Sequence, residues 1–187
     1  MKRSLVLFAS VTFFLFACII SAYAVELTAE MVSKEGKVTR NGKICVKENK
    51  TRIEKGSTPI YVILRGDKGL FWEINGAERT YSETKLTPDM KPSIEEKLFG
   101  ETARKQVGTE TVNGYAARKY EISVKRKNKN ETIYQWFSPE YSFPVKLSGM
   151  NWSVEYKNIK KGGIPDTIFE LPGGMTKETS EVPDVLH

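Results

Sequence analysis

Few residues in this 187-residue chain could carry acid–base or nucleophilic chemistry. The single histidine is the last residue, His187. A histidine base inside a pocket is therefore almost excluded, and with it a Ser–His or Cys–His nucleophile pair. Glu95 and Glu96 form a carboxylate pair, but neighbours on a helix point about 100° apart, which favours surface charges. Gly173-Gly174 precedes no helix signal, unlike a phosphate-binding loop. The sequence predicts no enzyme.

Cysteines and metal ligands are equally sparse. The chain has two cysteines, and Cys45 has neither a CxxC partner nor a cysteine cluster, which argues against zinc and redox roles. If Cys18 is removed by export processing, Cys45 alone cannot form an internal disulfide. We expect no metal and no cofactor.

The N-terminus has the pattern of a secretory signal peptide. A short positive start precedes an apolar run over residues 5–20 and the small-residue exit Ala22-Tyr23-Ala24. We predict that residues 1–24 are the signal, that cleavage follows Ala24 and that the protein is periplasmic. An uncleaved anchor is one alternative, although the run is shorter than the ~20 residues of a spanning helix. The other alternative is a lipoprotein-processing box at Leu15-Phe16-Ala17-Cys18, with an acylated Cys18 holding the protein at a membrane.

The charge excess is mild. The formal net charge is +6, and Lys2 and Arg3 lie in the predicted signal. The lysines are spread along the chain, and the one dense run, Lys125–Asn130, is typical of a solvated hairpin tip. This distribution is not that of a nucleic-acid-binding surface.

Polar and apolar residues alternate along much of the chain, as in strands with one buried and one solvated face. The predicted strands cover residues 26–34, 43–47, 60–64, 70–74, 116–125, 132–136, 143–147 and 152–157. Asn41-Gly42, Asn75-Gly76 and Asn113-Gly114 suit tight turns with positive φ. Short turns between successive strands predict an antiparallel meander.

One segment, residues 87–100, departs from this alternation. Pro92 or Ser93 could open a short helix and Gly100 could close it, with Ile94 and Leu98 on one face. Such a helix would lie over one mouth of the sheet. We expect one domain over residues 25–175 and a flexible polar tail over residues 176–187.

The aromatic residues suggest a binding surface. One short helix cannot cover the apolar face of a sheet this large, so a curved sheet would leave a concave apolar groove. We therefore predict a mainly β (α+β) fold, a single curved antiparallel sheet forming an unclosed half-barrel with a short helical lid; a closed barrel with a filled interior is the alternative. The candidate groove residues are Trp72, Tyr120, Tyr134, Trp136, Leu147, Trp152 and Leu98.

Four blocks, in order, resemble the LolA-like superfamily of outer-membrane lipoprotein carriers, most of all its shorter uncharacterised periplasmic members. They are Gly42–Lys47, Ile60–Trp72, Val107–Tyr115 and Pro165–Met175. The resemblance spans most of residues 26–175. It implies an unclosed antiparallel half-barrel with helices as a lid, which in the carriers shields the acyl chains of lipoproteins.

Two features differ from the carriers. Carriers begin with an amphipathic helix, whereas Val25-Glu26-Leu27 here enters a strand directly. Carriers also place a lid-holding arginine after a Trp-Val-Lys-type strand, and the matching position here is Glu48. What the resemblance carries over is the fold and the binding of apolar ligands.

The sequence thus predicts a monomeric periplasmic binding protein or carrier for acylated or lipidic ligands. Its expected partners are a lipid or acyl-chain ligand, such as a lipoprotein, and an envelope protein. The alternative is a non-catalytic protein-docking or envelope-sensing module that uses the same apolar sheet face.

Overall fold

The computed structural model describes residues 25–126 and 129–178, and these form one 12-stranded sheet. Its strands are β1 (Glu26–Glu35), β2 (Val38–Lys47), β3 (Lys50–Lys55), β4 (Ile60–Arg65), β5 (Leu70–Asn75), β6 (Thr80–Lys85), β7 (Glu101–Val112), β8 (Tyr115–Arg126), β9 (Lys129–Ser138), β10 (Phe143–Ser148), β11 (Trp152–Lys161) and β12 (Thr176–Lys177). Two short 3₁₀ helices accompany them, η1 (Pro88–Met90) and η2 (Asp166–Phe169).

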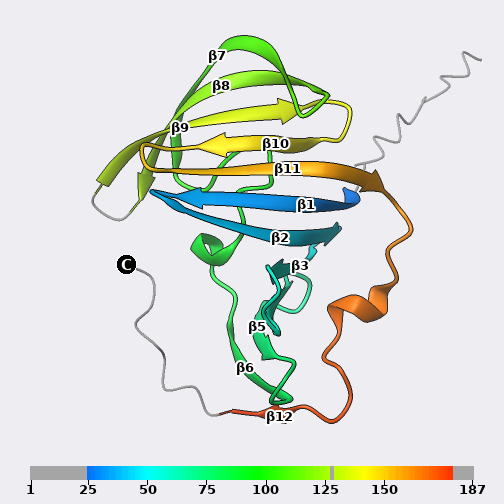
Figure 1. The fold of residues 1–187 in the computed structure, drawn as a ribbon. Coiled ribbons are helices and arrows are strands. Elements are labelled where there is room, and N and C mark those ends of the chain that lie inside the picture. Colours follow the sequence, from blue (N-terminus) through cyan, green and yellow to red (C-terminus); the bar gives the residue numbers. More distant parts are fainter. Residues whose placement is uncertain (1–24, 127–128, 179–187) are drawn as a thin grey trace, which may run out of the picture.

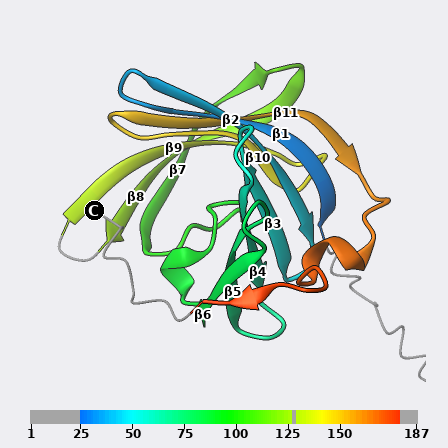
Figure 2. The ribbon, with the colours of Figure 1, turned by 60° about the horizontal axis from the view of Figure 1, so that its bottom comes forward.

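The strand order is β12-β6-β5-β4-β3-β2-β1-β11-β10-β9-β8-β7, antiparallel except where β12 joins β6. Two meanders, β1–β6 and β7–β11, meet where β1 pairs with β11. The edge strands β12 and β7 do not pair, so the sheet is unclosed. The connection from β6 to β7, residues 86–100, must therefore pass from one side of the sheet to the far edge. It runs inside the curve of the sheet (Figures 1 and 2).

The predicted mainly β, unclosed antiparallel fold is confirmed, and each predicted strand overlaps an observed one. Strands β3, β6, β7 and β12 were not predicted. β7 is almost entirely exposed along its 12 residues, because an edge strand contacts little. Its sequence therefore lacks the alternation that marks the half-buried strands.

The predicted helix from Pro92 or Ser93 to Gly100 is wrong. Residues 91–100 form bends and turns, and the helical residues of this connection are those of η1, which ends before residue 91. The carbonyls of Glu95 and Glu96 accept hydrogen bonds from side chains of the sheet. Since these interactions occupy groups that a helix would pair internally, tertiary contacts override the local signal.

The predicted turn at Asn41-Gly42 is also wrong, because both residues lie inside β2. The β1–β2 turn lies at Gly36, where φ is +55°. Gly42 passes so close to the Glu54 carbonyl that a Cβ would collide with it. The glycine thus permits a close strand approach. At Asn113-Gly114 the predicted turn is confirmed, with φ of 51° and 86°.

Apolar side chains pack on both faces of the sheet. On the inner face, toward residues 86–100, the main core includes Leu27, Ile44, Val46, Leu98, Tyr120, Ile122, Ile133, Phe137, Phe143, Leu147 and Tyr156. On the outer face of β2–β5, a second core consists of Cys45, Ile63, Trp72, Ile74, Ile164 and Phe169. The register of β4 and β5 supports this division. Ile63 pairs with Trp72, and the next residue, Leu64, pairs with Phe71. Because successive side chains of a strand point to opposite faces, these two pairs lie on opposite faces of the sheet.

Candidate ligand-binding cavity

Residues 86–100, which we call the lid loop, border a half-open cavity of about 560 Å³ against the inner face. This volume lies within the range of small-molecule sites. Its apolar lining consists of Val25, Val46, Leu64, Leu86, Pro92, Ile94, Phe137 and Phe143. Its polar lining consists of Glu48, Asn49, Thr51, Lys91, Glu95, Glu96 and Ser142, with Gly66 completing the wall.

Strand alternation positions the apolar lining. Val46 on β2, Thr51 on β3 and Leu64 on β4 are successive cross-strand partners, so their side chains form one row on the inner face. The β2–β3 turn then places Glu48, with a left-handed φ of 53°, beside this row at the end of the sheet. The result is an apolar surface with a polar rim.

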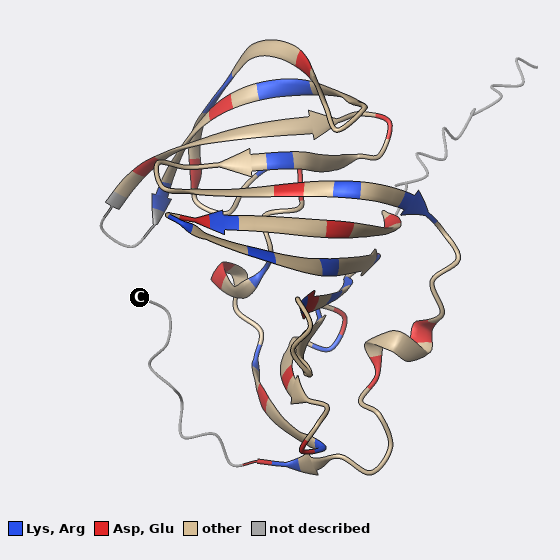
Figure 3. Cartoon of the chain, in the orientation of Figure 1, with Lys and Arg blue, Asp and Glu red and all other residues tan. Residues whose placement is uncertain are grey.

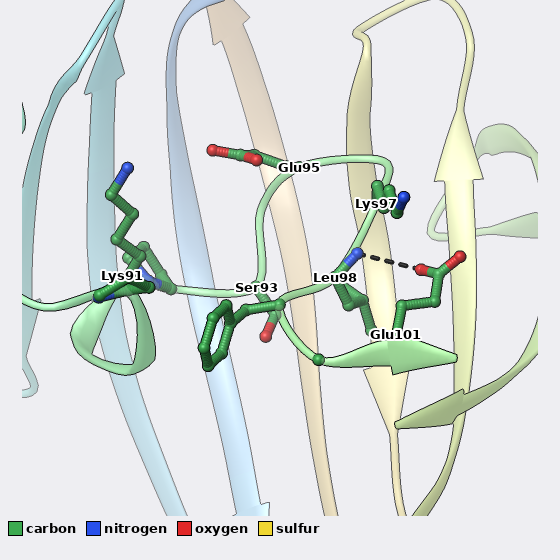
Figure 4. Close-up of a pocket in the computed structure, with 10 residues that line it drawn as sticks. Lys91, Ser93, Glu95, Lys97, Leu98 and Glu101 are labelled. Carbon is green, nitrogen blue, oxygen red and sulfur yellow. Dashed lines mark hydrogen bonds between the residues drawn. The ribbon is translucent and has the colours of Figure 1, made fainter. Parts of the chain in front are cut away.

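Side chains of β7 and β9 hold the lid loop. Arg104 donates hydrogen bonds to the Glu96 carbonyl and to the Gln135 side chain, the latter at 3.0 Å. The fully buried Gln135 amide in turn donates to the Glu95 carbonyl at 3.0 Å. Glu101 accepts from the Leu98 N–H at 3.0 Å (Figure 4) and from Arg104 Nε at 2.9 Å. The lid is thus attached mainly through polar groups.

The charge state of Glu101 depends on these contacts. Burial by itself raises the pKa of the Glu101 carboxyl, but hydrogen bonds from Arg104 and from the Leu98 N–H outweigh burial and hold the pKa below its ordinary value. Glu101 is consequently ionised at neutral pH, as its interaction with Arg104 requires.

A smaller hollow of about 350 Å³ lies within the lid loop itself. Leu98, Phe99 and Glu101 contribute to it, and Figure 4 shows Glu95 turned away from Glu101. Leu98 is the only one of the predicted groove residues that lines either of these two cavities.

Three other predicted groove residues lie on the inner face without reaching the larger cavity. Tyr120 and Leu147 are buried in the main core, and Trp152 is partly buried against it. Arg104 lies over the Tyr120 ring at 4.6 Å. Together with Leu98, these residues support the lid and the sheet beneath it.

The remaining three lie on the outer face. Trp72 belongs to the second core, and its Nε1 donates to Glu83 at 2.9 Å. Trp136 pairs with Lys119 and Lys146, whose ammonium groups lie 4.8 and 5.2 Å from its ring. Tyr134 lies on the same face of β9, two residues away. Trp136 is nevertheless buried in the main core cluster and Tyr134 packs against it, so six of the seven residues lie in or against that core and Trp72 lies in the second. Leu98 is the one of the seven that lines either cavity, and ligand binding by the seven residues stays a prediction.

Sequence reasoning missed Val46, Leu64, Phe137 and Phe143, which line the cavity. Their alternation was visible, but only the curvature of the sheet shows that they share one surface. It also missed Arg104, Gln135 and Glu101. The sequence carried no signal for Gln135, because it alternates with Tyr134 and Trp136 as a solvent-facing residue would, and only the structure shows it buried and in need of hydrogen-bond partners.

The site offers binding surface and little reactive chemistry. Within residues 25–126 and 129–178, no three side chains of the metal-binding types gather in one place. Cys45 lies buried in the second core, and burial raises the pKa of its thiol, which makes it a poor nucleophile. Charged residues of both signs are distributed over the strands (Figure 3). None of the helices in the described part of the chain is long and apolar enough to cross a membrane.

Residues 25–141 match the model of the DUF4412 family, a domain of unknown function, and the chain belongs to this family. No curated protein matches the chain. The unclosed, mainly antiparallel sheet agrees with the fold that the resemblance to the lipoprotein carriers implies.

Solved structures of MucB share the fold at low identity. MucB in the Pseudomonas aeruginosa MucA/MucB complex superposes with a TM-score of 0.54 and 12% identity, over 78% of this chain and 55% of that one. MucB alone also gives a TM-score of 0.54 with 12% identity, over 81% and 59%. The chain therefore spans little more than half of MucB. A domain from Vibrio parahaemolyticus, described as an outer membrane lipoprotein-sorting protein domain, matches with a TM-score of 0.40 and 11% identity, over 78% and 89%.

Proposed function

We propose that this protein is a monomeric periplasmic binding protein or carrier for an acylated or lipidic ligand, and that the ligand occupies the cavity beneath the lid loop. The observation that supports this most is the cavity of about 560 Å³, with aliphatic and aromatic side chains on the inner face and polar groups at its rim. Each methylene buried there contributes roughly 0.8 kcal/mol. A lipoprotein acyl chain fits this chemistry.

The attachment of the lid supports a cavity that opens. In the lid loop only Leu98 is fully buried. Most of its other anchoring comes from the hydrogen bonds to Arg104, Gln135 and Glu101. Net hydrogen bonds contribute only about 0.5–1.5 kcal/mol each, since water replaces them on opening. Opening therefore costs far less than unfolding the sheet.

A periplasmic location is part of the proposal. It depends on export by residues 1–24 and cleavage after Ala24, which lie outside the described residues. Attachment through an acylated Cys18 is the alternative, and it would keep the same cavity at a membrane surface.

The direct test is native mass spectrometry of the protein purified from a bacterial periplasm, followed by organic extraction. We expect adducts of fatty-acyl mass, and uptake of a fluorescent lipid by the delipidated protein. A clean apo mass together with no uptake would contradict the carrier proposal.

A filling substitution locates the site. Ile94 lines the cavity from the lid, so Ile94→Trp should occupy the ligand volume and reduce lipid uptake at least tenfold. Phe99→Trp is the matched control, because Phe99 is 58% exposed on the same loop and does not line the larger cavity. Equal uptake by both variants would place the ligand elsewhere.

A protein-docking or envelope-sensing module is the second candidate. Its support is that MucB, with a similar fold, has been solved in complex with MucA(peri). In addition β7, a 12-residue edge strand, pairs only with β8 among the described strands. An exposed strand edge can accept a strand from a partner. The apo outcome of the mass spectrometry experiment would favour this function.

A further inference from the structure

The rim of the larger cavity carries an excess of negative charge. Glu48 comes from the β2–β3 turn, Glu95 and Glu96 come from the lid loop, and Lys91 is the one cation in the lining. All four side chains are exposed. Within the described part of the chain, the three carboxylates take part in no ion pair.

Neighbouring cations do not cancel this charge. Arg104 is engaged with the Glu101 carboxylate. Lys47 and Lys50 pair with each other across β2 and β3 on the outer face, and both form ion pairs with Asp166. Of these cations, Lys50 interacts electrostatically first with Asp166 and, more weakly, with Glu48. Counted over the described residues that line the cavity, three carboxylates and Lys91 give a formal excess of two negative charges beside the apolar lining, and Lys97 follows Glu96 on the lid loop outside that lining.

This arrangement discriminates between ligands of equal apolar content. A ligand with its chain against Val46, Leu64 and Phe143 places its polar end at the rim. Two unit charges about 6 Å apart in water interact by a little under 1 kcal/mol, so two excess charges change affinity about tenfold for each unit of ligand charge. The sign favours an ammonium group and disfavours a carboxylate or phosphate.

We infer that the cavity selects alkyl or acyl chains whose polar end is positively charged, over chains that end in an anionic group. This inference rests on the proposed function, because it concerns the ligand of the same cavity. It assigns Glu48, Glu95 and Glu96 a role in specificity, whereas the apolar lining provides affinity for any chain.

The test compares probes that share one chain length and differ only in charge. Decylammonium, decanol and decanoate are titrated into the full protein by calorimetry at neutral pH and low salt. We expect decylammonium to bind about tenfold more tightly than decanol, and decanoate about tenfold more weakly. Added salt should reduce both differences, since the rim is exposed to solvent.

Neutralising the rim provides the second readout. In the triple variant E48Q/E95Q/E96Q, the three affinities should converge to within about threefold. The matched control E30Q/E78Q/E140Q removes the same formal charge from positions outside the cavity lining, and it should keep the preference for decylammonium. Circular dichroism confirms that both variants fold.

The outcomes separate this inference from the proposed function. If decanoate binds as well as decylammonium, or if the preference survives in E48Q/E95Q/E96Q, charge selection is wrong while apolar binding stands. If none of the three probes binds, the proposed function fails, and charge selection fails with it.

Discussion

Two irregular segments cover this sheet, one on each face, and they are held in different ways. Residues 162–175, the C-terminal cover, lie on the outer face of β2–β5 and bury Ile164 and Phe169 completely or nearly so. The lid loop crosses the inner face, buries only Leu98 and leaves a cavity beneath it. The C-terminal cover is packed into the second core, whereas the lid loop leaves a cavity between itself and the sheet.

Arg65 shows how firmly the C-terminal cover is attached. Its side chain is 5% exposed and forms ion pairs with Asp67 and Glu170. It also donates to the Phe169 carbonyl at 3.2 Å. Hydrogen bonding to Asp67 and then to Glu170 raises the Arg65 pKa, so this arginine is always charged. Among the described residues, the lid's anchor Arg104 has the Glu101 carboxylate as its one ionic partner.

Removing one buried side chain from each cover should give the largest contrast. Phe169→Ala should lower the free energy of unfolding by about 3–5 kcal/mol, because Phe169 is fully buried in the second core. Leu98→Ala should cost about 2 kcal/mol, because the lid can settle into the space. Urea unfolding measures both values, and similar losses would contradict the comparison.

Releasing the lid should have a smaller effect, confined to one region. Arg104→Ala removes the donors to Glu96 and Gln135 and should cost about 1–3 kcal/mol. Hydrogen exchange at the Leu98 amide should accelerate at least tenfold, while the amides of β4 and η2 stay protected. Arg118→Ala, an exposed arginine of β8, is the control. Uniform acceleration throughout the sheet would show that the lid is not an independent unit.

Acid should loosen the lid by the smallest amount. The Glu101 pKa is below its ordinary value, so its stabilising contribution is fully present above about pH 4.3 and is lost as pH falls through the lowered pKa. Exchange at the Leu98 amide should rise as the pH falls below about 4.3, after correction for intrinsic rates.

The C-terminal cover also contains carboxyls whose pKa values are lowered, Asp166 and Glu170, each primarily by a hydrogen bond from Lys50 or Arg65. Glu101→Gln separates the two covers, since it should remove the pH dependence of the lid alone. Persistence of that dependence in Glu101→Gln would assign it to another group.

Alternation made most strands predictable, but only where one face is buried. Tyr120, Ile122 and Val124 mark β8 clearly, while β7 beside it shows no pattern because it is an exposed edge. Pro92, Ser93 and Gly100 are acceptable helix-end residues, yet side chains from β7 and β9 take the backbone carbonyls between them. The lid conformation could not be predicted from local sequence.

The candidate site was predictable in kind and not in position. Element counting led to the prediction of an apolar groove on a sheet with too little helix to cover it, and ligand binding in that groove stays a prediction. It could not assign a face to Trp72 or Trp136, because alternation gives two sets of side chains without saying which set faces inward. Only the crossing of the lid loop and the return of residues 162–175 decide that.

By itself, the amino-acid sequence determined eight of the strands and the antiparallel meander, since these follow from residue types and short-range periodicity. Tertiary structure decided which face of the sheet is concave, which segment covers each face and which residues line the cavity. The physical reason is that a strand buries whichever face another segment covers. The covering segments here, the lid loop and the C-terminal cover, contact strands that are far from them in the sequence, so local residue patterns do not show which face they cover.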